Sequence, residues 1–222
     1  MFWYVVFCCP GNRNHVNDAH LATLIGPCHV LTAGHCVHWK GKWAGNLKFN
    51  LIRRPGVGGA AFTTTTFDPI RVASPVGWVQ DGNLDLDYAV IELSKSPEAG
   101  WSSFGWNSGL GSSWHMNADG YLGDKDSRTM WNTFDQIDNA RENLFDYFLN
   151  TVPGSSRSGV YLYLAAQNSK VIYGVVSNES KKFVISFLDI WNLGIVMINT
   201  ATRISVVRFR LICAWMNEPS VC

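Results

Sequence analysis

Charged residues are scarce in this sequence. Lys, Arg, Asp and Glu together make up 16% of its 222 residues, and the formal net charge is only +1. The lysines and arginines do not cluster along any segment, so the basic footprint of a nucleic-acid-binding protein is missing. This composition excludes DNA or RNA as the expected partner.

Sequence patterns for metal binding and membrane insertion are also lacking. The six cysteines form no CxxC pair and fit no zinc template. The apolar run Met1–Cys9 is far too short to span a bilayer, and it has neither the basic start nor the cleavage site of a signal peptide. We therefore expect no metal, no cofactor and no membrane span, and we interpret Met1–Cys9 as a first β-strand.

The cysteines point to an oxidising compartment, in which they would form disulfides. Buried, unpaired thiols in a reducing compartment are the alternative. The triplet Asn178-Glu179-Ser180 is a glycosylation sequon, which is compatible with secretion. We expect a secreted or extracellular protein.

Short apolar segments that alternate with turn signals dominate what is present. Hydrophobic residues make up 47% of the chain, and turn signals such as Arg54-Pro55-Gly56 and Pro153-Gly154 separate them. This rhythm predicts an all-β sandwich or barrel rather than βαβ units. The expected strands are His20–Ile25, His29–Thr32, Leu47–Ile52, Ala61–Thr66, Tyr88–Leu93, Gly159–Ala165, Val171–Val176, Phe183–Phe187 and Gly194–Ile198.

A Gly- and Ser-rich stretch near the middle of the chain suggests two domains. Trp101–Ser113 has the composition of a linker, so we predict one domain over residues 1–105 and another over 106–222. The clearest helix begins near Ser205, where apolar residues recur at three- and four-residue steps. Asp138–Leu149 is a weaker helix candidate, with Asp138 as its cap.

Three segments carry residue types suited to acyl transfer by serine. Such chemistry needs a hydroxyl beside an imidazole, a carboxylate that orients the imidazole, and backbone N–H groups for the oxyanion. The run His29–Cys36 offers a histidine after a short strand, Asp85–Leu93 offers an acid at the start of an apolar strand, and Pro153–Tyr161 offers serines in a turn. Their order along the chain is His, Asp, Ser.

These segments resemble the motifs of trypsin-like serine peptidases of the chymotrypsin fold. HVLTAGHCV is similar to the histidine motif of that family, DLDYAVIEL to its aspartate strand and PGSSRSGVY to its serine loop. The match is best with the glutamyl endopeptidases and with the secreted animal proteases typified by serine protease twenty-three. The resemblance implies two antiparallel Greek-key six-stranded β-barrels with a C-terminal α-helix, and a site in the cleft between them.

The resemblance also assigns roles to individual residues. It implies His35 as general base, Asp87 as the acid that orients it and Ser156 as nucleophile, with the N–H groups of Gly154 and Ser156 as the oxyanion hole. It places Asn150 and Thr151 at the base of the primary substrate pocket. The residues that it places on the pocket wall are Val176, Ser177 and Asn178.

Neighbouring residues compete for two of these roles. Asp85 lies two residues before Asp87 and so on the same face of a strand, but only Asp87 is followed closely by the apolar run. Ser155 and Ser158 flank Ser156, but only Ser156 has a glycine two residues before it, where a tight turn exposes N–H groups. The other five histidines have no motif around them.

Two residues depart from the family pattern. Arg157 stands where the family has glycine, and a bulky side chain there is expected to crowd the nucleophile. Ser155 stands where zymogens of the family carry the aspartate that pairs with a new N-terminus, so activation by that ion pair is not expected. The partner of Cys36 stays open between Cys28, Cys9 and none.

The sequence therefore predicts a monomeric serine endopeptidase acting on protein or peptide substrates. A pocket base without an acid favours a neutral side chain next to the scissile bond. One alternative is a catalytically weakened or inactive protease homologue that acts by binding. A third hypothesis is a β-rich domain that binds carbohydrate or protein, with its many Trp and Tyr residues as stacking platforms.

Overall fold

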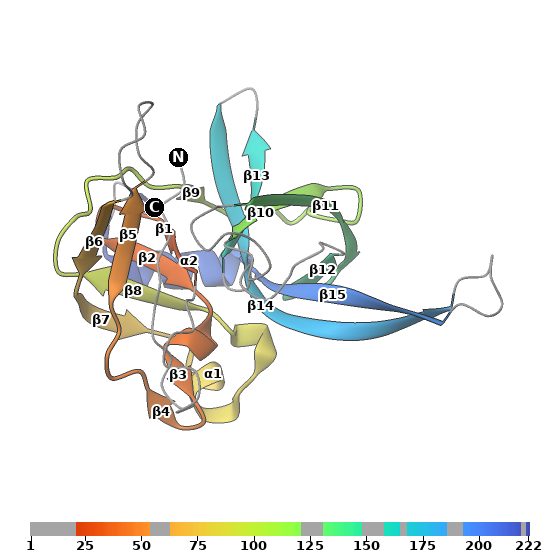
Figure 1. Cartoon of the computed structure of the whole chain (residues 1–222), viewed down its shortest axis with the longest axis horizontal. Helices are drawn as coiled ribbons and strands as arrows, with labels where there is room; N and C mark the ends of the chain where they lie inside the picture. The colour runs from red at the N-terminus through yellow and green to blue at the C-terminus, as the bar shows by residue number, and fades with distance from the viewer. Residues whose placement is uncertain are drawn as a thin grey trace.

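The computed structural model describes residues 21–53, 63–120, 131–147, 158–164, 168–185, 193–218 and 221–222. The predicted first strand Met1–Cys9 lies outside these ranges. Within them the regular structure is mostly β-strand, with one short helix, α1 (Val76–Asp81), two 3-10 turns and one longer helix, α2 (Val206–Met216). Figure 1 shows the two halves of the chain side by side, with α2 behind them near the centre.

The first half of the chain is built on a four-stranded antiparallel sheet. Its order is β1 (Thr23–Leu24), β2 (His29–Thr32), β8 (Ala89–Leu93) and β7 (Pro69–Ala73). Two hairpins accompany this sheet, β3 (His38–Trp39) with β4 (Lys42–Trp43) and β5 (Phe49–Arg53) with β6 (Thr63–Phe67). Val30, Ile91, Phe49 and Leu51 share one apolar core, so the β5–β6 hairpin packs on the four-stranded sheet.

The second half forms a closed barrel of six strands. The ring runs β13, β10, β11, β12, β15, β14 and back to β13, and all its pairs are antiparallel. A two-residue strand, β9, adds to the outer edge of β14 in parallel. The strands are β9 (Ser103–Phe104), β10 (His115–Gly120), β11 (Trp131–Ala140), β12 (Leu144–Tyr147), β13 (Gly159–Leu164), β14 (Ser169–Ile185) and β15 (Leu193–Arg203).

Side chains from every strand of this ring fill the barrel. The enclosed apolar cluster includes Met116, Ile137, Phe145, Val160 and Ala201. A Cβ at Gly174 would lie 2.7 Å from the Phe145 ring, so only glycine fits where β14 passes this aromatic side chain. The all-β prediction is confirmed, with a six-stranded barrel and a C-terminal helix.

Strands β14 and β15 continue beyond the barrel as a two-stranded ribbon. Their ladder runs from Gly174↔Arg203 to Ile185↔Leu193, whereas β13 pairs with β14 only as far as Val175. Figure 1 shows the ribbon projecting away from the body. The expected strand Val171–Val176 and the described part of the expected strand Phe183–Phe187, as far as Ile185, thus belong to one long strand.

The helix predicted over Asp138–Leu149 is wrong. Asp138 lies in β11, and Leu144–Tyr147 is β12, paired with both β11 and β15. Leu144, Phe145 and Tyr147 are buried in the barrel wall, so tertiary burial decides the conformation of this segment.

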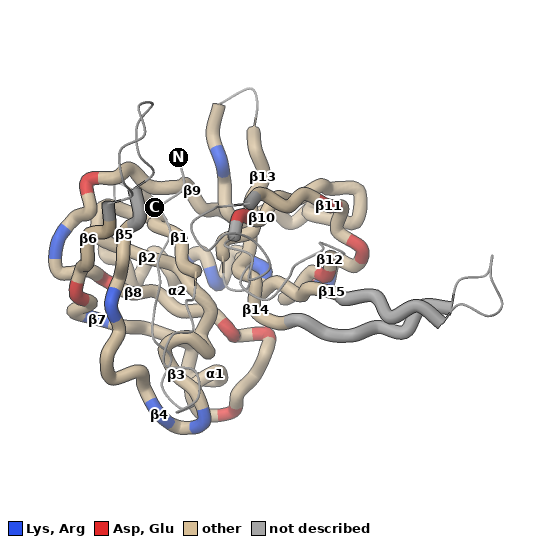
Figure 2. The backbone as a smooth tube through the Cα atoms, in the orientation of Figure 1, with Lys and Arg blue, Asp and Glu red and all other residues tan. Residues whose placement is uncertain are grey.

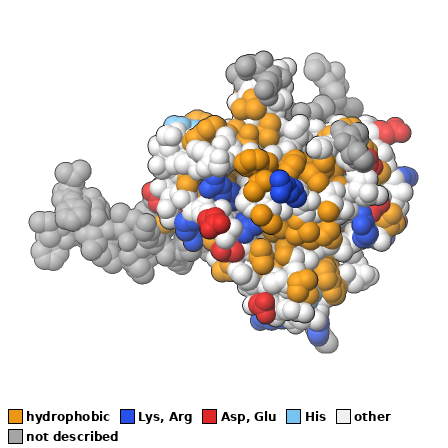
Figure 3. Space-filling view, turned by 180° about the vertical axis from the view of Figure 1, so that it is seen from behind, with side chains coloured by type: hydrophobic (Ala, Val, Ile, Leu, Met, Phe, Trp, Pro, Cys, Tyr) orange, Lys and Arg blue, Asp and Glu red, His pale blue; other side chains and the backbone are white. Residues whose placement is uncertain are grey.

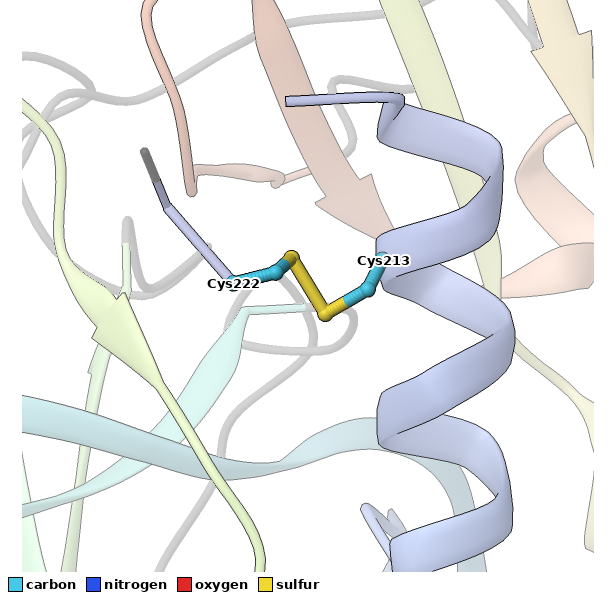
Figure 4. Close-up of a disulfide and its surroundings, with 2 residues drawn as sticks. All are labelled: Cys213 and Cys222. Carbon is cyan, nitrogen blue, oxygen red and sulfur yellow. A yellow bond between two sulfur atoms is a disulfide. The ribbon is translucent and has the colours of Figure 1, made fainter. Parts of the chain in front are cut away.

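The helix α2 begins where the sequence predicts it. The Ser205 side chain accepts a hydrogen bond from the Arg208 N–H, as an N-cap does. Ile212 and Met216 of α2 share a core with Ile25 and Leu31 of the first half, so the C-terminal helix packs under the first sheet. A disulfide joins Cys213 of α2 to Cys222 (Figure 4).

Figure 2 shows positions of Lys, Arg, Asp and Glu scattered along the described part of the chain. This agrees with the low charge content and shows no stripe of one sign. From behind, apolar side chains gather over one face of the molecule (Figure 3). None of the helices in the described ranges is long and apolar enough to cross a membrane.

Candidate active site

His35 lies in a tight 3-10 turn directly after strand β2. The turn spans Gly34–Cys36, and its backbone closes with a hydrogen bond from Val37 to Gly34. A Cβ at Gly34 would lie 2.7 Å from the Trp78 ring, so a glycine is required for the turn to pack against that indole. The side chain of His35 is 14% exposed, so it is mostly buried but still reaches solvent.

Asp87 lies beside His35 because strands β2 and β8 are neighbours. Thr32 pairs with Ala89, so the turn after β2 and the residues before β8 meet at the same end of the sheet. Asp87 Oδ2 lies 2.7 Å from His35 Nδ1, and Asp87 Oδ1 accepts a hydrogen bond from the His35 backbone N–H at 2.8 Å. Asp87 is only 1% exposed, so this charge-assisted pair is shielded from water.

The carboxylate fixes the orientation of the imidazole. With Nδ1 held by Asp87, Nε2 is the nitrogen through which His35 would exchange a proton with a reacting group. Thr202 of β15 donates from Oγ1 to the backbone carbonyl of Asp87 at 3.3 Å, so the barrel of the second half also holds this residue. The arrangement suits a general base whose tautomer is preset.

Asp85 has a different environment from Asp87. Its carboxylate accepts a hydrogen bond from the Asn143 side chain at 3.2 Å, in the turn between β11 and β12. It therefore faces the second half of the molecule rather than His35. The 3-10 turn Leu84–Leu86 separates the directions of the two carboxylates.

Two residues beside His35 and Asp87 were not found by sequence reasoning. Trp78 of α1 contacts the imidazole edge-on, with ring centres 6.3 Å apart, and donates its Nε1–H to the His38 carbonyl at 3.2 Å. Thr202 is the second. Nothing in the sequence around Trp78 distinguishes it from the other tryptophans, because its role comes from where α1 packs.

The predicted pocket wall lies at the point where β14 leaves the barrel. Val176 and Ser177 are buried and Asn178 is exposed, and a register shift between Val176 and Asn178 marks a β-bulge. Ser177 Oγ donates to the Thr200 carbonyl at 3.2 Å. Val176 belongs to the barrel core, and its N–H donates to the Ser158 carbonyl at 3.0 Å.

The chain resembles proteases in both sequence and fold. No protein-family model matches it. It is 30% identical over 142 residues to the glutamyl endopeptidase of Bacillus licheniformis, covering 62% of this chain and 43% of that protein. It is 27% identical over 222 residues to serine protease 23 of Rattus norvegicus, covering 88% of this chain and 55% of the relative. A solved Glu endopeptidase structure in complex with MPD superposes with a TM-score of 0.68 at 21% identity, covering 98% of this chain and 90% of that one.

The chain is a homologue of the trypsin-like serine peptidases. The sequence-based recognition of this family is thereby confirmed. The chain spans about half the length of these curated relatives. A further relative, at 24% identity over 255 residues and covering 88% of this chain and 60% of its own length, is the inactive serine protease 35 of Mus musculus.

In this trypsin-like fold, several predicted site residues lie outside the described residues. They are Ser156, Gly154, Asn150 and Thr151, together with Arg157 and Ser155. The start of β13, just beyond the serine loop, is well anchored, because the Gly159 N–H donates to Thr23 Oγ1 at 3.1 Å across the two halves. The structure thus brings together His35 and Asp87 in the first half and anchors the start of β13 against β1.

One described cysteine outside the C-terminal disulfide, Cys28, departs from the predicted disulfide framework. Cys28 is an unpaired thiol, which excludes a Cys28–Cys36 disulfide; Cys9 lies outside the described residues. Burial raises the pKa of the Cys28 thiol, and Glu218 and Glu92 raise it further. Among the described residues, no group of His, Cys, Asp and Glu is arranged to hold a metal ion.

Proposed function

We propose that this chain is a serine endopeptidase that hydrolyses peptide bonds through an acyl-enzyme. The observation that carries the proposal is the buried Asp87 carboxylate held against His35 Nδ1 at 2.7 Å. An imidazole oriented through Nδ1 in this way can serve through Nε2 as the general base that a serine nucleophile requires.

The proposed reaction uses Ser156 as the nucleophile. Its Oγ attacks the scissile carbonyl carbon while His35 Nε2 accepts the hydroxyl proton, and the N–H groups of Gly154 and Ser156 stabilise the oxyanion. His35 then gives the proton to the leaving amine, which yields the acyl-enzyme. A water molecule, deprotonated by His35, hydrolyses the ester and frees Ser156.

The finer features of the fold and setting form part of the same proposal. We infer that residues 1–105 make a first six-stranded barrel and residues 106–222 the second, with the site between them. The core that the four-stranded sheet of the first half shares with the β5–β6 hairpin supports a barrel there. We infer a monomer that acts outside the cell on protein or peptide substrates, with a neutral residue before the scissile bond accepted by Asn150, Thr151, Val176, Ser177 and Asn178.

Arg157 supports an alternative in which the same fold binds peptides with weak or no turnover. The similarity to the inactive serine protease 35 of Mus musculus also supports this alternative. Under it, Arg157→Gly raises turnover of a generic ester, because glycine relieves crowding next to Ser156. An Arg157→Gly variant with unchanged turnover contradicts this alternative.

Labelling with a fluorophosphonate tests the main proposal. The reagent should modify the chain covalently, and Ser156→Ala should abolish the modification. Ser155→Ala is the matched control, because it removes the neighbouring hydroxyl and should leave labelling intact. Failure of the wild-type chain to react, or labelling that persists in Ser156→Ala, contradicts the proposal.

A further inference from the structure

A short hairpin of tryptophans and lysines projects next to the candidate general base. Strands β3 and β4 join through Lys40 and Gly41, whose φ angles of 48° and 78° are both positive. Two successive positive φ values are the signature of a tight two-residue hairpin turn. Gly41 adopts this conformation without strain, whereas Lys40 is held in it, so the tip of the hairpin has one fixed shape.

An aromatic row connects this hairpin to His35. The Trp39 ring stacks on Trp78 at 6.3 Å and 30° between planes, and Trp78 meets the His35 imidazole edge-on at 6.3 Å. The Trp78 N–H also holds the hairpin backbone at the His38 carbonyl. The hairpin is therefore fixed relative to the imidazole through Trp78 rather than hanging free in solvent.

The exposed side of the hairpin combines an indole face with the ammonium groups of two lysines. Trp39 is 45% exposed even though one face stacks on Trp78. Lys42 pairs with Trp39 across the hairpin, and Lys40 Nζ lies 5.8 Å from the Trp39 ring centre. Within the described part of the chain, neither lysine forms an ion pair.

We propose that Trp39, Lys40 and Lys42 form a docking site for an acidic residue of the polypeptide substrate. A Glu or Asp side chain places its methylene groups on the indole and its carboxylate between the two ammonium groups. The ring centres of Trp39 and Trp78 are 6.3 Å apart, and those of Trp78 and His35 are also 6.3 Å apart. About four residues of extended chain, at about 3.3 Å per residue, cover the path from Trp39 to His35. The acidic residue therefore lies within about four residues of the scissile bond. This inference rests on the proposed endopeptidase function.

Charge complementarity decides the class of substrate. Neither lysine has a carboxylate partner among the described residues, so both ammonium groups are available to a substrate carboxylate, although the net charge of the chain is only +1. A substrate segment with Lys or Arg at the same place is repelled. The site thus sets a preference for acidic sequences that is separate from the primary pocket.

Peptide kinetics with charge-reversal variants test this inference. The substrates are internally quenched peptides that differ only in carrying Glu, Gln or Lys at one position within about four residues of the scissile bond. At one of these positions, KM for the Glu peptide should be about three- to tenfold lower than for the Lys peptide at low ionic strength, as for two exposed ion pairs. High salt should shrink the difference.

The double variant Lys40→Glu/Lys42→Glu should reverse this preference. Hydrolysis of a small uncharged ester should stay unchanged in that variant, because the lysines do not touch the reacting atoms. Lys95→Glu is the matched control, since it makes one of the same charge changes elsewhere on the first half and should leave the preference intact. Trp39→Ala should raise KM for the Glu peptide without reversing its preference.

Equal KM values for Glu and Lys peptides at every position overturn the inference. The inference is also overturned if the Lys40→Glu/Lys42→Glu variant loses binding to anionic lipid vesicles but keeps the wild-type preference for the Glu peptide. Binding of the Glu peptide to the Ser156→Ala chain, followed by fluorescence anisotropy, separates this inference from the proposed function. Lysine-dependent binding to Ser156→Ala, together with a wild-type chain that no fluorophosphonate labels, supports the docking site and refutes turnover. Labelling of the wild-type chain without any charge preference refutes only the docking site.

Discussion

At the scale of single residues, Asp87 is the most constrained group of the candidate site. Both of its carboxylate oxygens bind His35, and its backbone carbonyl accepts from Thr202. The carboxylate is buried, so any residue placed there must supply acceptors for the imidazole N–H and for the backbone N–H. We therefore expect this position to tolerate little change.

We predict that Asp87→Asn lowers turnover of a peptide or ester substrate by a factor on the order of 10⁴, the loss known for triads of the chymotrypsin type. The amide presents either a donor or an acceptor to His35, and its donor stabilises the wrong tautomer. The chain should still fold, because asparagine has nearly the same shape. Asp85→Asn is the control and should retain most activity; equal losses in the two variants would contradict the assignment.

His29 is a buried histidine whose protonation opposes folding. It is buried, and neither ring nitrogen has a hydrogen-bond partner among the described residues. Burial lowers its pKa from the ordinary value of 6.5, while nearby Glu92 and Glu218 partly oppose the shift and Arg71 adds to it. The native chain therefore holds His29 neutral.

Because the pKa is lower in the folded state, protons bind the unfolded chain more readily. Neutral His29 makes its full contribution to the free energy of unfolding above about pH 6.5. That contribution is lost progressively as the pH falls from there toward the lower pKa of the folded state. We predict that His29→Leu flattens this loss in urea unfolding measured at about pH 7 and about pH 5. His115→Leu, at an exposed histidine, is the control; identical acid losses in wild type and His29→Leu would refute the prediction.

At the scale of elements, the disulfide ties the end of the chain to α2. Cys213 and Cys222 are nine residues apart in sequence, so the bridge closes a short loop. The α2 helix carries core residues for both halves of the molecule, so holding its end affects more than the tail. Ile212 and Met216 are the buried residues next to the bridge.

Removing the bridge should lower stability measurably. A loop of this size corresponds to about 2–3 kcal/mol of denatured-state entropy, so Cys222→Ser is expected to lower Tm by about 5–10 °C in calorimetry. Wild type in reductant should approach the same value. Cys28→Ser is the control because Cys28 is an unpaired thiol; a Cys222→Ser variant that melts with wild type overturns the prediction.

The elements that could be predicted from sequence are those with a clear apolar pattern. His29–Thr32 and the strand before Leu93 have every or nearly every side chain buried, so their apolar runs stand out. Strands β10 and β11 were missed because their sequences, HMNADG and WNTFDQIDNA, are largely polar. Pairing in the ring, not propensity, makes them strands.

The same limit applies to the candidate site. The His and Asp motifs are local in sequence, so the side-chain pair they form was predictable. Trp78 and Thr202 act through packing between distant elements, 43 and 115 residues away in sequence from the His35 and Asp87 they touch. No local pattern encodes such a contact.

At the scale of the whole molecule, Arg208 couples the two halves. This buried arginine of α2 donates to the carbonyls of Asn143 and Arg203 at 2.7 and 2.6 Å. Burial lowers its pKa, and Asp85, Glu142 and the Tyr88 ring lie close enough to oppose that shift. Since Asn143 in turn binds Asp85, one chain of contacts runs from α2 through the barrel to the turn before Asp87.

Arg208→Met should therefore destabilise the molecule and loosen the coupling. The Arg203 carbonyl loses the Arg208 donor, and the Asn143 carbonyl keeps only its bond from the Arg203 N–H. Each lost hydrogen bond costs about 1–3 kcal/mol at most, partly offset by removal of a desolvated charge. We expect a net loss of about 2 kcal/mol in urea unfolding, with fluorescence and circular dichroism transitions that no longer coincide. Arg210→Met, at an exposed position of the same helix, should behave as wild type; a variant as stable as wild type contradicts the coupling.

The position of α2 has a consequence for the order of folding. Residues near the end of the sequence fill the core beneath a sheet formed by residues near its start, with Met216 against Gly26 and Ile212 beside Leu31. Contacts that span so much of the chain close late and slowly. During synthesis the core of the first half therefore stays incompletely packed until α2 has been made. Any exposure of its apolar surface in that interval is the point at which this fold is most open to aggregation.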